Sequence, residues 1–192
     1  MSEAQAGGER PRLALHVCCG PCASAVIERL AEDYDVIAVW YNPNIDPPAE
    51  HDRRLEGMRR VAELSGVPLV ELAHDPEAWA EACAGLMDEP EGGARCGVCF
   101  RLRLQRVARW AAEGGISALA TTLTVSPHKS AARINAIGQA VCRDHRIAFV
   151  AEDFKQRDGF RRSVELSREW GIYRQTWCGC APAREGVGRG PG

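Results

Sequence analysis

The sequence has no long hydrophobic run and almost no excess of charge of one sign. No stretch approaches the roughly 18 consecutive apolar residues of a membrane-spanning helix, and residues 1–12 contain Gly, Glu and Gln where a signal peptide needs a continuous apolar stretch. With 24 basic and 26 acidic residues, the formal net charge is −2. We therefore expect a cytoplasmic protein without a membrane partner, on which any nucleic-acid surface is local.

The sequence also contains very little lysine. Only 2 of the 24 basic residues are Lys, which is typical of a GC-rich gene rather than of a function. Of the 192 residues, 45% are apolar and 26% are charged, so the composition excludes an intrinsically disordered chain. Residues 1–11 and 183–192 lack hydrophobic periodicity, and we expect them to be flexible tails of a single domain that spans residues 12–182.

Short apolar runs alternate with helical patterns along the chain. The predicted strands are Leu13–Val17, Val36–Tyr41, Pro68–Leu72, Ile116–Thr122 and Ile147–Ala151. The predicted helices are Pro21–Asp33, Ala49–Ser65, Pro76–Met87, Cys99–Glu113 and Lys129–Arg146. Such alternation favours right-handed crossovers. We expect an α/β fold with a five-stranded, mostly parallel, Rossmann-like (HUP-like) sheet and helices on both faces.

Polar segments follow four of the five predicted strands. They are His16-Val-Cys-Cys19, Tyr41-Asn-Pro-Asn44, Thr121-Thr-Leu-Thr124 and Asp153-Phe-Lys155. In open α/β sheets, ligands bind beyond the carboxyl ends of the strands. We therefore expect the four segments to meet at one edge of the sheet and to build a site there.

Cysteine is the most informative residue type. Seven of the nine cysteines fall into three tight groups: Cys18, Cys19 and Cys22; Cys96 and Cys99; Cys178 and Cys180. In a reducing compartment, clustered thiols indicate a metal or redox centre rather than structural disulfides. The remaining two, Cys83 and Cys142, lie within helical patterns and are predicted to be buried small hydrophobic residues.

The spacing of the first two groups suits metal or cluster ligation. Cys96-Gly-Val-Cys99 lets two thiolates bind one metal or one face of a cluster, and Cys18 and Cys19 can supply two more thiolates for an iron–sulfur site. A structural zinc site and a metal-free dithiol are the alternatives. A single zinc ion needs only four ligands, however, and leaves three of the clustered thiols unexplained.

Cys178-Gly-Cys180 is a different kind of pair. One intervening residue closes a very small disulfide ring, which is strained and easily reduced. The spacing suits a redox-active disulfide or two ligands for a further metal. Asp153 is a candidate metal ligand or proton donor, with an exposed turn carboxylate as the alternative. For His16, the alternatives are a hydrogen-bonded core histidine and a ligand.

Together these residues resemble one family, the cobalamin-independent, QueH-type epoxyqueuosine reductases. The matching segments are His16-Val-Cys-Cys-Gly-Pro-Cys22, Tyr41-Asn-Pro-Asn-Ile45 with Pro48 and Glu50, Arg95-Cys-Gly-Val-Cys-Phe-Arg-Leu-Arg103, Thr121-Thr-Leu-Thr-Val-Ser-Pro-His-Lys129, Asp153-Phe-Lys155, Gly159-Phe-Arg-Arg-Ser163 and Tyr173-Arg-Gln-Thr-Trp-Cys-Gly-Cys180. No matched cysteine is missing. The sequence departs from the usual family pattern at Gly20, Ala23, His51 and His128.

The resemblance implies reduction of epoxyqueuosine to queuosine at the wobble position of a tRNA anticodon. It also implies a [4Fe-4S] cluster on Cys18, Cys19, Cys96 and Cys99, and a redox role for Cys178 and Cys180. Opening an epoxide to an alkene consumes two electrons and two protons, and it releases the oxygen as water. We therefore expect a second redox or Lewis-acidic centre, for which an additional mononuclear iron held by Cys22, Cys178, Cys180 and Asp153 is the candidate.

The implied partners are a tRNA that carries epoxyqueuosine and an external low-potential electron donor. Asp153 or Lys155 is the expected proton donor. The candidates for stacking on the unpaired base are Trp40, Tyr41 and Trp177, and for each of them packing within the fold is the alternative. Four arginines on the helix after Cys99 either form a solvated face or contact phosphates: Arg101, Arg103, Arg106 and Arg109.

Two other functions stay open at this stage. One is a tRNA-thiolating or nucleotide-activating α/β enzyme, which needs a Gly-rich phosphate loop after the first strand, where this chain has Cys18-Cys-Gly-Pro-Cys22. The other is a non-catalytic cluster carrier or sensor, or a zinc-stabilised binding module.

Overall fold

The structure is a computed structural model that describes residues 10–187. Its elements follow the order β1 (Arg12–Val17), α1 (Gly20–Leu30), β2 (Asp35–Trp40), α2 (Pro48–Ser65), β3 (Leu69–Glu71), α3 (Pro76–Ala82), α4 (Ala94–Glu113), β4 (Ala118–Thr121), the 3-10 helix η1 (Thr122–Val125), α5 (Ala131–Asp144), β5 (Ala148–Phe149), α6 (Gly159–Glu169) and α7 (Ala181–Val187). All five predicted strands are present. Among the described helices, none combines the length and apolar character needed to cross a lipid bilayer.

The strands form one sheet in the order β3-β2-β1-β4-β5, and every neighbouring pair is parallel. The predicted α/β class is confirmed, with a sheet that is wholly parallel. β1 lies at the centre, where Leu13 pairs with Val36 of β2 and with Ala118 of β4. The strand order reverses between β1 and β4. This is the switch point at which α/β sheets of this type open a crevice for ligands.

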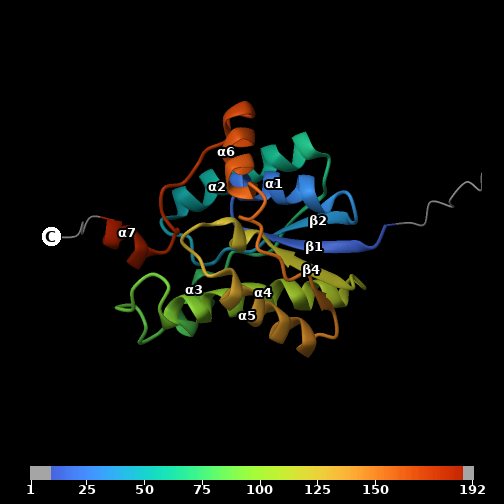
Figure 1. The fold of residues 1–192 in the computed structure, drawn as a ribbon. Helices are drawn as coiled ribbons and strands as arrows, with labels where there is room; N and C mark the ends of the chain where they lie inside the picture. Colours follow the sequence, from blue (N-terminus) through green and yellow to red (C-terminus); the bar gives the residue numbers. More distant parts are fainter. Residues whose placement is uncertain (1–9, 188–192) are drawn as a thin grey trace, which may run out of the picture.

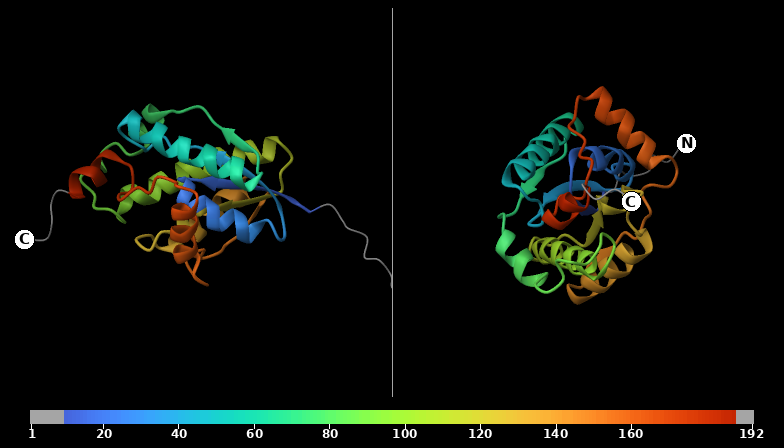
Figure 2. Two further views of the ribbon diagram at one scale, coloured as in Figure 1. Left: turned by 90° about the horizontal axis from the view of Figure 1, so that it is seen from above. Right: turned by 90° about the vertical axis from the view of Figure 1, so that its left-hand side faces the viewer.

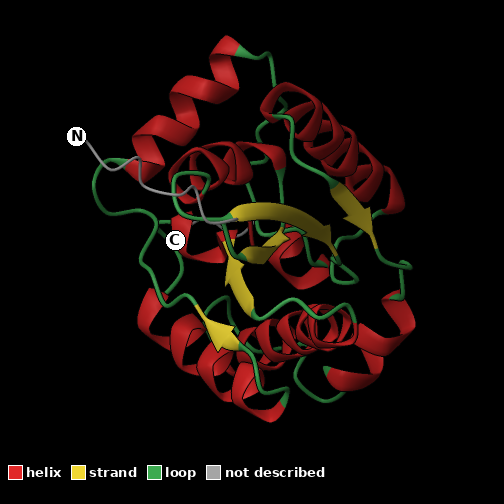
Figure 3. Ribbon diagram, turned by 90° about the vertical axis from the view of Figure 1, so that its right-hand side faces the viewer, coloured by secondary structure: helices red, strands yellow, loops and turns green. Residues whose placement is uncertain are grey.

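Helices cover both faces of the sheet (Figure 1). α1, α2 and α6 form one layer, and α3, α4 and α5 form the other, with the strands between them in Figures 2 and 3. Alternate side chains of β1 point to opposite faces. Leu13 and Leu15 pack against α1 and α2, while Ala14 packs against α4 and α5. Because both faces of the central strands are buried, the strands are mainly apolar, which explains why the sequence pattern detected them.

Two helix boundaries differ from expectation near the cysteines. α4 begins at Ala94, five residues before the predicted start, because the Glu89 carboxylate accepts a hydrogen bond from the Ala94 N–H at 3.0 Å. Cys96 and Cys99 therefore both lie inside a helix. α5 begins at Ala131, after Ser130, whose hydroxyl accepts a hydrogen bond from the Arg133 N–H at 3.3 Å.

Helical structure also continues beyond residue 182, where the expected domain ends. Ala183 and Arg184 donate backbone hydrogen bonds to the Cys180 carbonyl oxygen at 3.0 and 3.2 Å, which starts α7. Arg184 also forms an ion pair with Asp46 at 3.3 Å. Of the expected tails, residues 1–9 and 188–192 lie outside the described residues.

Gly20→Ala is expected to destabilise the fold. Gly20 opens α1 where it passes α2, and a Cβ there lies 2.6 Å from the Gly57 carbonyl oxygen. Such overpacking against backbone costs about 1–3 kcal/mol, so urea unfolding of the apo chain should give a lower free energy of unfolding. Gly57→Ala is the matched control, because its Cβ approaches Ile172 only to 3.4 Å. An equal loss in both variants would contradict this account of the α1–α2 contact.

Candidate metal and redox site

A cavity of about 520 Å³ lies at the carboxyl ends of the strands, beside the switch point between β1 and β4. Its lining comes from the segments that follow β1, β2 and β4, from α4, and from residues 174–178. Three of the four polar segments that the sequence placed at this edge therefore meet in one cavity. The fourth, Asp153-Phe154-Lys155, is not part of the lining.

Cys18, Cys19 and Cys22 form the tightest sulfur group. Cys18 follows β1, Cys19 caps α1, and Cys22 lies in the first turn of that helix. Their three Sγ atoms lie within 4.8 Å of one another. Sulfur ligands of one tetrahedral metal lie about 3.8 Å apart when each metal–sulfur distance is about 2.3 Å. The three sulfur atoms therefore fit a metal centre. The group contains Cys18 and Cys19, which the sequence assigned to the cluster, and also Cys22.

Cys96 and Cys99 lie nearly one turn apart on α4 and connect the other two groups. Cys96 packs in one buried cluster with Cys18, and Cys99 packs in a second with Cys178 and Cys180. Cys18 and Cys178 also line the same cavity. The three sequence groups thus surround one region. Among the described residues, the group of three or more at metal-ligand spacing is the set of Cys18, Cys19 and Cys22, so the assignment of Cys96 and Cys99 as ligands stays a prediction.

The three thiols of the first group differ strongly in pKa. Hydrogen bonds from Cys19 and Cys22 hold the pKa of Cys18 well below its usual value. The same contact with Cys18 raises the pKa of Cys19 to about 12 and also raises the pKa of Cys22. Cys18 is therefore the thiolate of the group. A thiolate is the form of cysteine that binds metals.

Cys178 and Cys180 form a second unequal pair, and both are reduced thiols. A hydrogen bond from Cys180 lowers the pKa of Cys178 to about 6 against the effect of burial, and the positive charges of Lys129 and Arg103 act in the same direction. The contact with Cys178 and burial together raise the pKa of Cys180 strongly. At neutral pH the pair therefore holds one nucleophilic sulfur beside one protonated sulfur.

Arg54 fixes the loop that carries this pair. Its guanidinium donates to the carbonyl oxygens of Trp177 at 3.2 Å and Cys178 at 3.0 Å, and it forms a 2.6 Å ion pair with Glu50. Glu50 also accepts a hydrogen bond from the Tyr173 hydroxyl. The sequence analysis missed Arg54. Its spacing four residues after Glu50 on a predicted helix was the signal that could have identified the ion pair.

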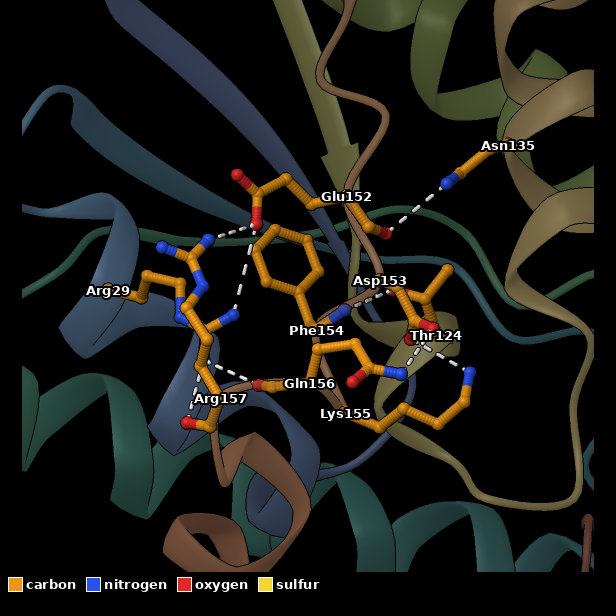
Figure 4. A network of polar contacts seen from close by, with 9 residues as sticks. All are labelled: Arg29, Thr124, Asn135, Glu152, Asp153, Phe154, Lys155, Gln156 and Arg157. Carbon is orange, nitrogen blue, oxygen red and sulfur yellow. Dashed lines mark hydrogen bonds and ion pairs between the residues drawn. The ribbon is translucent and has the colours of Figure 1, made fainter.

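Asp153 and Lys155 pair with each other outside the cavity (Figure 4). The Lys155 ammonium donates to the Asp153 carboxylate at 2.8 Å, and the Phe154 N–H donates to the Thr124 hydroxyl at 3.3 Å. Burial alone would raise the pKa of Asp153, but hydrogen bonds from Lys155 and Gln156 lower it overall. Their assignment as proton donors stays a prediction that this arrangement does not support.

For Trp40, Tyr41 and Arg103, the structure shows burial instead of a surface that could contact RNA. Trp40 and Tyr41 are buried, with 1% and 3% of their surface exposed, so they offer no stacking face, whereas Trp177 lines the cavity. Arg103 is buried at the cavity instead of lying on a solvated face. Sequence spacing alone cannot show this burial, because Arg101 and Arg109 on the same helix have the same charge and are exposed.

His16 is a buried core histidine. Its Nδ1 lies 2.8 Å from the Thr121 hydroxyl, and burial, with a smaller effect of Arg103, lowers its pKa to about 3. It is therefore neutral at physiological pH. Its Nε2 has no hydrogen-bond partner among the described residues.

The fold and the cavity define a class of protein: a parallel α/β protein with a thiolate-rich centre at its switch point. The family model described as "Epoxyqueuosine reductase QueH" matches residues 13–185. The chain therefore belongs to the epoxyqueuosine reductase QueH family, and the resemblance noted from its motifs is confirmed.

Two curated relatives have the same description. The protein from Streptococcus pyogenes serotype M1 is 39% identical over 180 residues, which cover 91% of this chain and 71% of that protein. The protein from Staphylococcus epidermidis is 34% identical over 197 residues, which cover 97% of this chain and 83% of that protein.

A solved structure shares the fold. The U34-tRNA thiolase NcsA from Methanococcus maripaludis, solved with its [4Fe-4S] cluster, superposes with a TM-score of 0.56 at 13% identity. The alignment covers 92% of this chain and 63% of that one. At this identity the likeness concerns the arrangement of strands and helices alone.

Near neutral pH, iodoacetamide should modify the two thiolates of the reduced apo chain, Cys18 and Cys178, faster than its other cysteines, and the reaction can follow the titration of Cys178. Because its pKa lies at about 6, the reactive thiolate should form as the pH rises through that value. Peptide mass mapping at a series of pH values from about 4 to about 9, which spans the lowered pKa and that of a free thiol, measures the modification rate of each cysteine. In the Cys180→Ala variant, loss of the hydrogen-bond donor should move the Cys178 midpoint upward. A midpoint near about 8.5 in the unaltered chain, the value of a free thiol, would contradict the unequal pair.

Proposed function

We propose that this chain reduces epoxyqueuosine in a tRNA anticodon to queuosine, and that it uses a [4Fe-4S] cluster held at the cysteine-lined cavity. Membership of the QueH family supports the reaction. The observation that supports the chemistry is the gathering of three cysteine groups, distant in sequence, around one cavity. The reaction adds two electrons and two protons to the epoxide, breaks both of its C–O bonds, and yields an alkene and water.

The proposed cluster ligands are Cys18, Cys19, Cys96 and Cys99. Support comes from the packing of Cys96 with Cys18 and from the burial of Cys19, Cys96 and Cys99, because burial shields a cluster from solvent. A bound cluster supplies electrons one at a time. We assign Cys22, Cys178 and Cys180 to the second centre, as a redox-active pair and as ligands of an additional mononuclear iron.

The cavity has the size and polarity expected for a modified base. Its volume of about 520 Å³ falls within the usual range for small-molecule sites. Asn44 and Gln175 line it, and the side-chain oxygen of each has no hydrogen-bond donor among the described residues. Buried acceptors of this kind are costly unless a ligand donates to them. We infer that they receive the hydroxyl or amine donors of the modified base.

Lys129 provides a positive charge where the epoxide oxygen would leave. It lines the cavity and lies 3.5 Å from Glu91. Burial lowers its pKa, but the nearby Cys178, Glu91 and Cys18 raise it overall, so the side chain is an ammonium at neutral pH. An ammonium at this position stabilises developing alkoxide charge. Asp153 and Lys155 supply the protons only if the loop after β5 approaches the cavity.

The rim of the cavity offers a stacking surface for RNA. Phe160 lines the cavity with 38% of its surface exposed, and the Arg174 guanidinium lies 5.5 Å from the centre of its ring. Single-stranded bases stack on aromatic rings and on guanidinium planes. We infer that Phe160 and Trp177 contact bases of the anticodon loop, in place of the buried Trp40 and Tyr41.

The deciding experiment is an anaerobic assay on tRNA that carries the epoxide, with an external low-potential reductant and mass analysis of the nucleosides. Loss of one oxygen should require chain reconstituted with iron and sulfide. Cys96→Ser and Cys99→Ser should reduce both iron content and turnover, by at least about 100-fold for turnover. The matched control is Cys142→Ser, which replaces a buried thiol packed against α4 and outside the cavity lining.

Cys178→Ala and Cys180→Ala form the second arm of this assay. Both should abolish turnover while the sulfide content and the iron of the cluster are retained, so that only the additional mononuclear iron is lost. A colourless protein that holds one zinc and does not turn over would refute the proposed function in favour of a non-catalytic binding module. Full turnover without Cys178 and Cys180 would instead refute the second centre that we assign to them.

Phe160→Ala should weaken tRNA binding by about 5- to 150-fold, the range that corresponds to one lost stacking contact. Fluorescence anisotropy with an anticodon stem-loop measures it, and raising the salt concentration should weaken binding for all variants. Leu64→Ala is the matched control, because Leu64 is an exposed apolar residue on α2. Equal affinities for the Phe160 and Leu64 variants would place the RNA elsewhere.

A further inference from the structure

Arg103 is a buried cation without an acidic partner among the described residues. It lies on α4, four residues after Cys99, with 2% of its surface exposed, and it lines the cavity. Its Nη2 donates to the Asn42 side-chain oxygen, and its Nε has no partner among the residues that the structure describes. Because a guanidinium keeps its proton at any physiological pH, the protein cannot avoid this charge by titration.

The two other buried arginines are satisfied differently. Arg54 has the Glu50 carboxylate at 2.6 Å. Arg95 donates to the backbone carbonyl oxygens of Leu86, Met87 and Glu89. Arg103 has one neutral side-chain acceptor, so the protein around it provides neither of these solutions. A buried charge that is left unpaired is strongly destabilising, and the balancing negative charge must therefore come from the cavity side.

The groups that face Arg103 are thiols. Its positive charge acts on Cys18, Cys99 and Cys178, which come from all three cysteine groups. It contributes to the lowered pKa of Cys18 and Cys178, and it opposes the burial that raises the pKa of Cys99. Of the other cations that line this cavity, Lys129 pairs with Glu91 and Arg54 pairs with Glu50, while Arg174 donates to the Ser163 carbonyl oxygen and the Ser167 hydroxyl. Arg103 is thus the cation whose balance depends on the sulfur atoms.

Asn42 fixes the position of Arg103 at the switch point. Asn42 follows β2, and its side-chain N–H donates to the Val17 carbonyl oxygen at the end of β1 at 2.9 Å. This hydrogen bond turns the amide so that its oxygen faces Arg103. Through Asn42, the guanidinium is therefore held by the ends of two neighbouring strands.

We propose that Arg103 is the fixed counter-charge of the cysteine-bound iron–sulfur centre, a positioning residue that Asn42 orients and that makes the centre easier to reduce. The inference rests on the proposed function for the identity of the centre. Four thiolates give such a centre a net negative charge, and reduction adds one more electron. A fixed positive charge in a buried site stabilises the reduced form more than the oxidised form, so it raises the reduction potential.

The test is a redox titration of the reconstituted full-length chain, followed by electron paramagnetic resonance. Arg103→Gln should lower the midpoint potential of the cluster. Each tenfold loss of relative stabilisation of the reduced form corresponds to a shift of about 59 mV for a one-electron couple. Arg103→Lys keeps the charge and should restore most of the potential. The matched control is Arg109→Gln on the exposed surface of α4, which should leave the potential unchanged.

Asn42→Asp keeps Arg103 in place and tests the charge separately. A carboxylate at this position neutralises the guanidinium, so this variant should lower the potential as Arg103→Gln does. Unchanged potentials in Arg103→Gln and Asn42→Asp would overturn the proposal. A second outcome would also overturn the proposal, in favour of a purely structural role for Arg103. In that outcome, Arg109→Gln takes up iron, whereas none of Arg103→Gln, Arg103→Lys and Asn42→Asp does. A native chain that binds no cluster contradicts the proposed function instead, so the two failures are distinguishable.

Discussion

The parallel pairing of β1 with both β2 and β4 is the constraint on which the site depends. It places the ends of three strands side by side, so that the segments containing Cys18, Asn42 and Thr122 meet at the switch point. The two neighbours also hold the end of β1 directly, because Asn42 donates to Val17 and the Cys18 N–H donates to the Thr122 hydroxyl at 3.3 Å. A thiol at this position has a fixed backbone before any metal binds, which is the preorganisation that a metal site requires.

Charge balance is the second constraint on the cavity. Four Arg and Lys side chains, Arg54, Arg103, Lys129 and Arg174, line a space that Cys18 and Cys178 also line. In a buried site, thiolates and cations stabilise one another because solvent screening is weak. Arg54 and Lys129 have carboxylate partners, whereas Arg103 faces sulfur. Together with hydrogen bonds from neighbouring thiols, this arrangement lowers the pKa of Cys18 and of Cys178, whereas the other thiols of the two groups stay protonated.

The sequence predicted the strands well because both faces of the central strands are buried and the strands are mainly apolar. It predicted helix ends less well, since α4 and α5 start at caps formed by Glu89 and Ser130, which depend on local backbone geometry. For the site, it identified the seven clustered cysteines and the cavity-lining Trp177, Lys129 and Asn44 segments. It placed Asp153 and Lys155 with them because they follow β5, but β5 is the edge strand next to β4, and their side chains pair with each other.

The sequence by itself therefore determined the fold class, the family and the chemical type of the site. Alternation of apolar runs, and thiols at fixed spacing within a strand end or a helical turn, are local properties. Only the tertiary structure decided which residues share the cavity and which charges are balanced. Arg101 and Arg103 look equivalent in the sequence, yet one is exposed and the other is buried beside sulfur. The reason is physical: burial and the sign of the surrounding charge are sums over residues from distant segments, and no local pattern contains that sum.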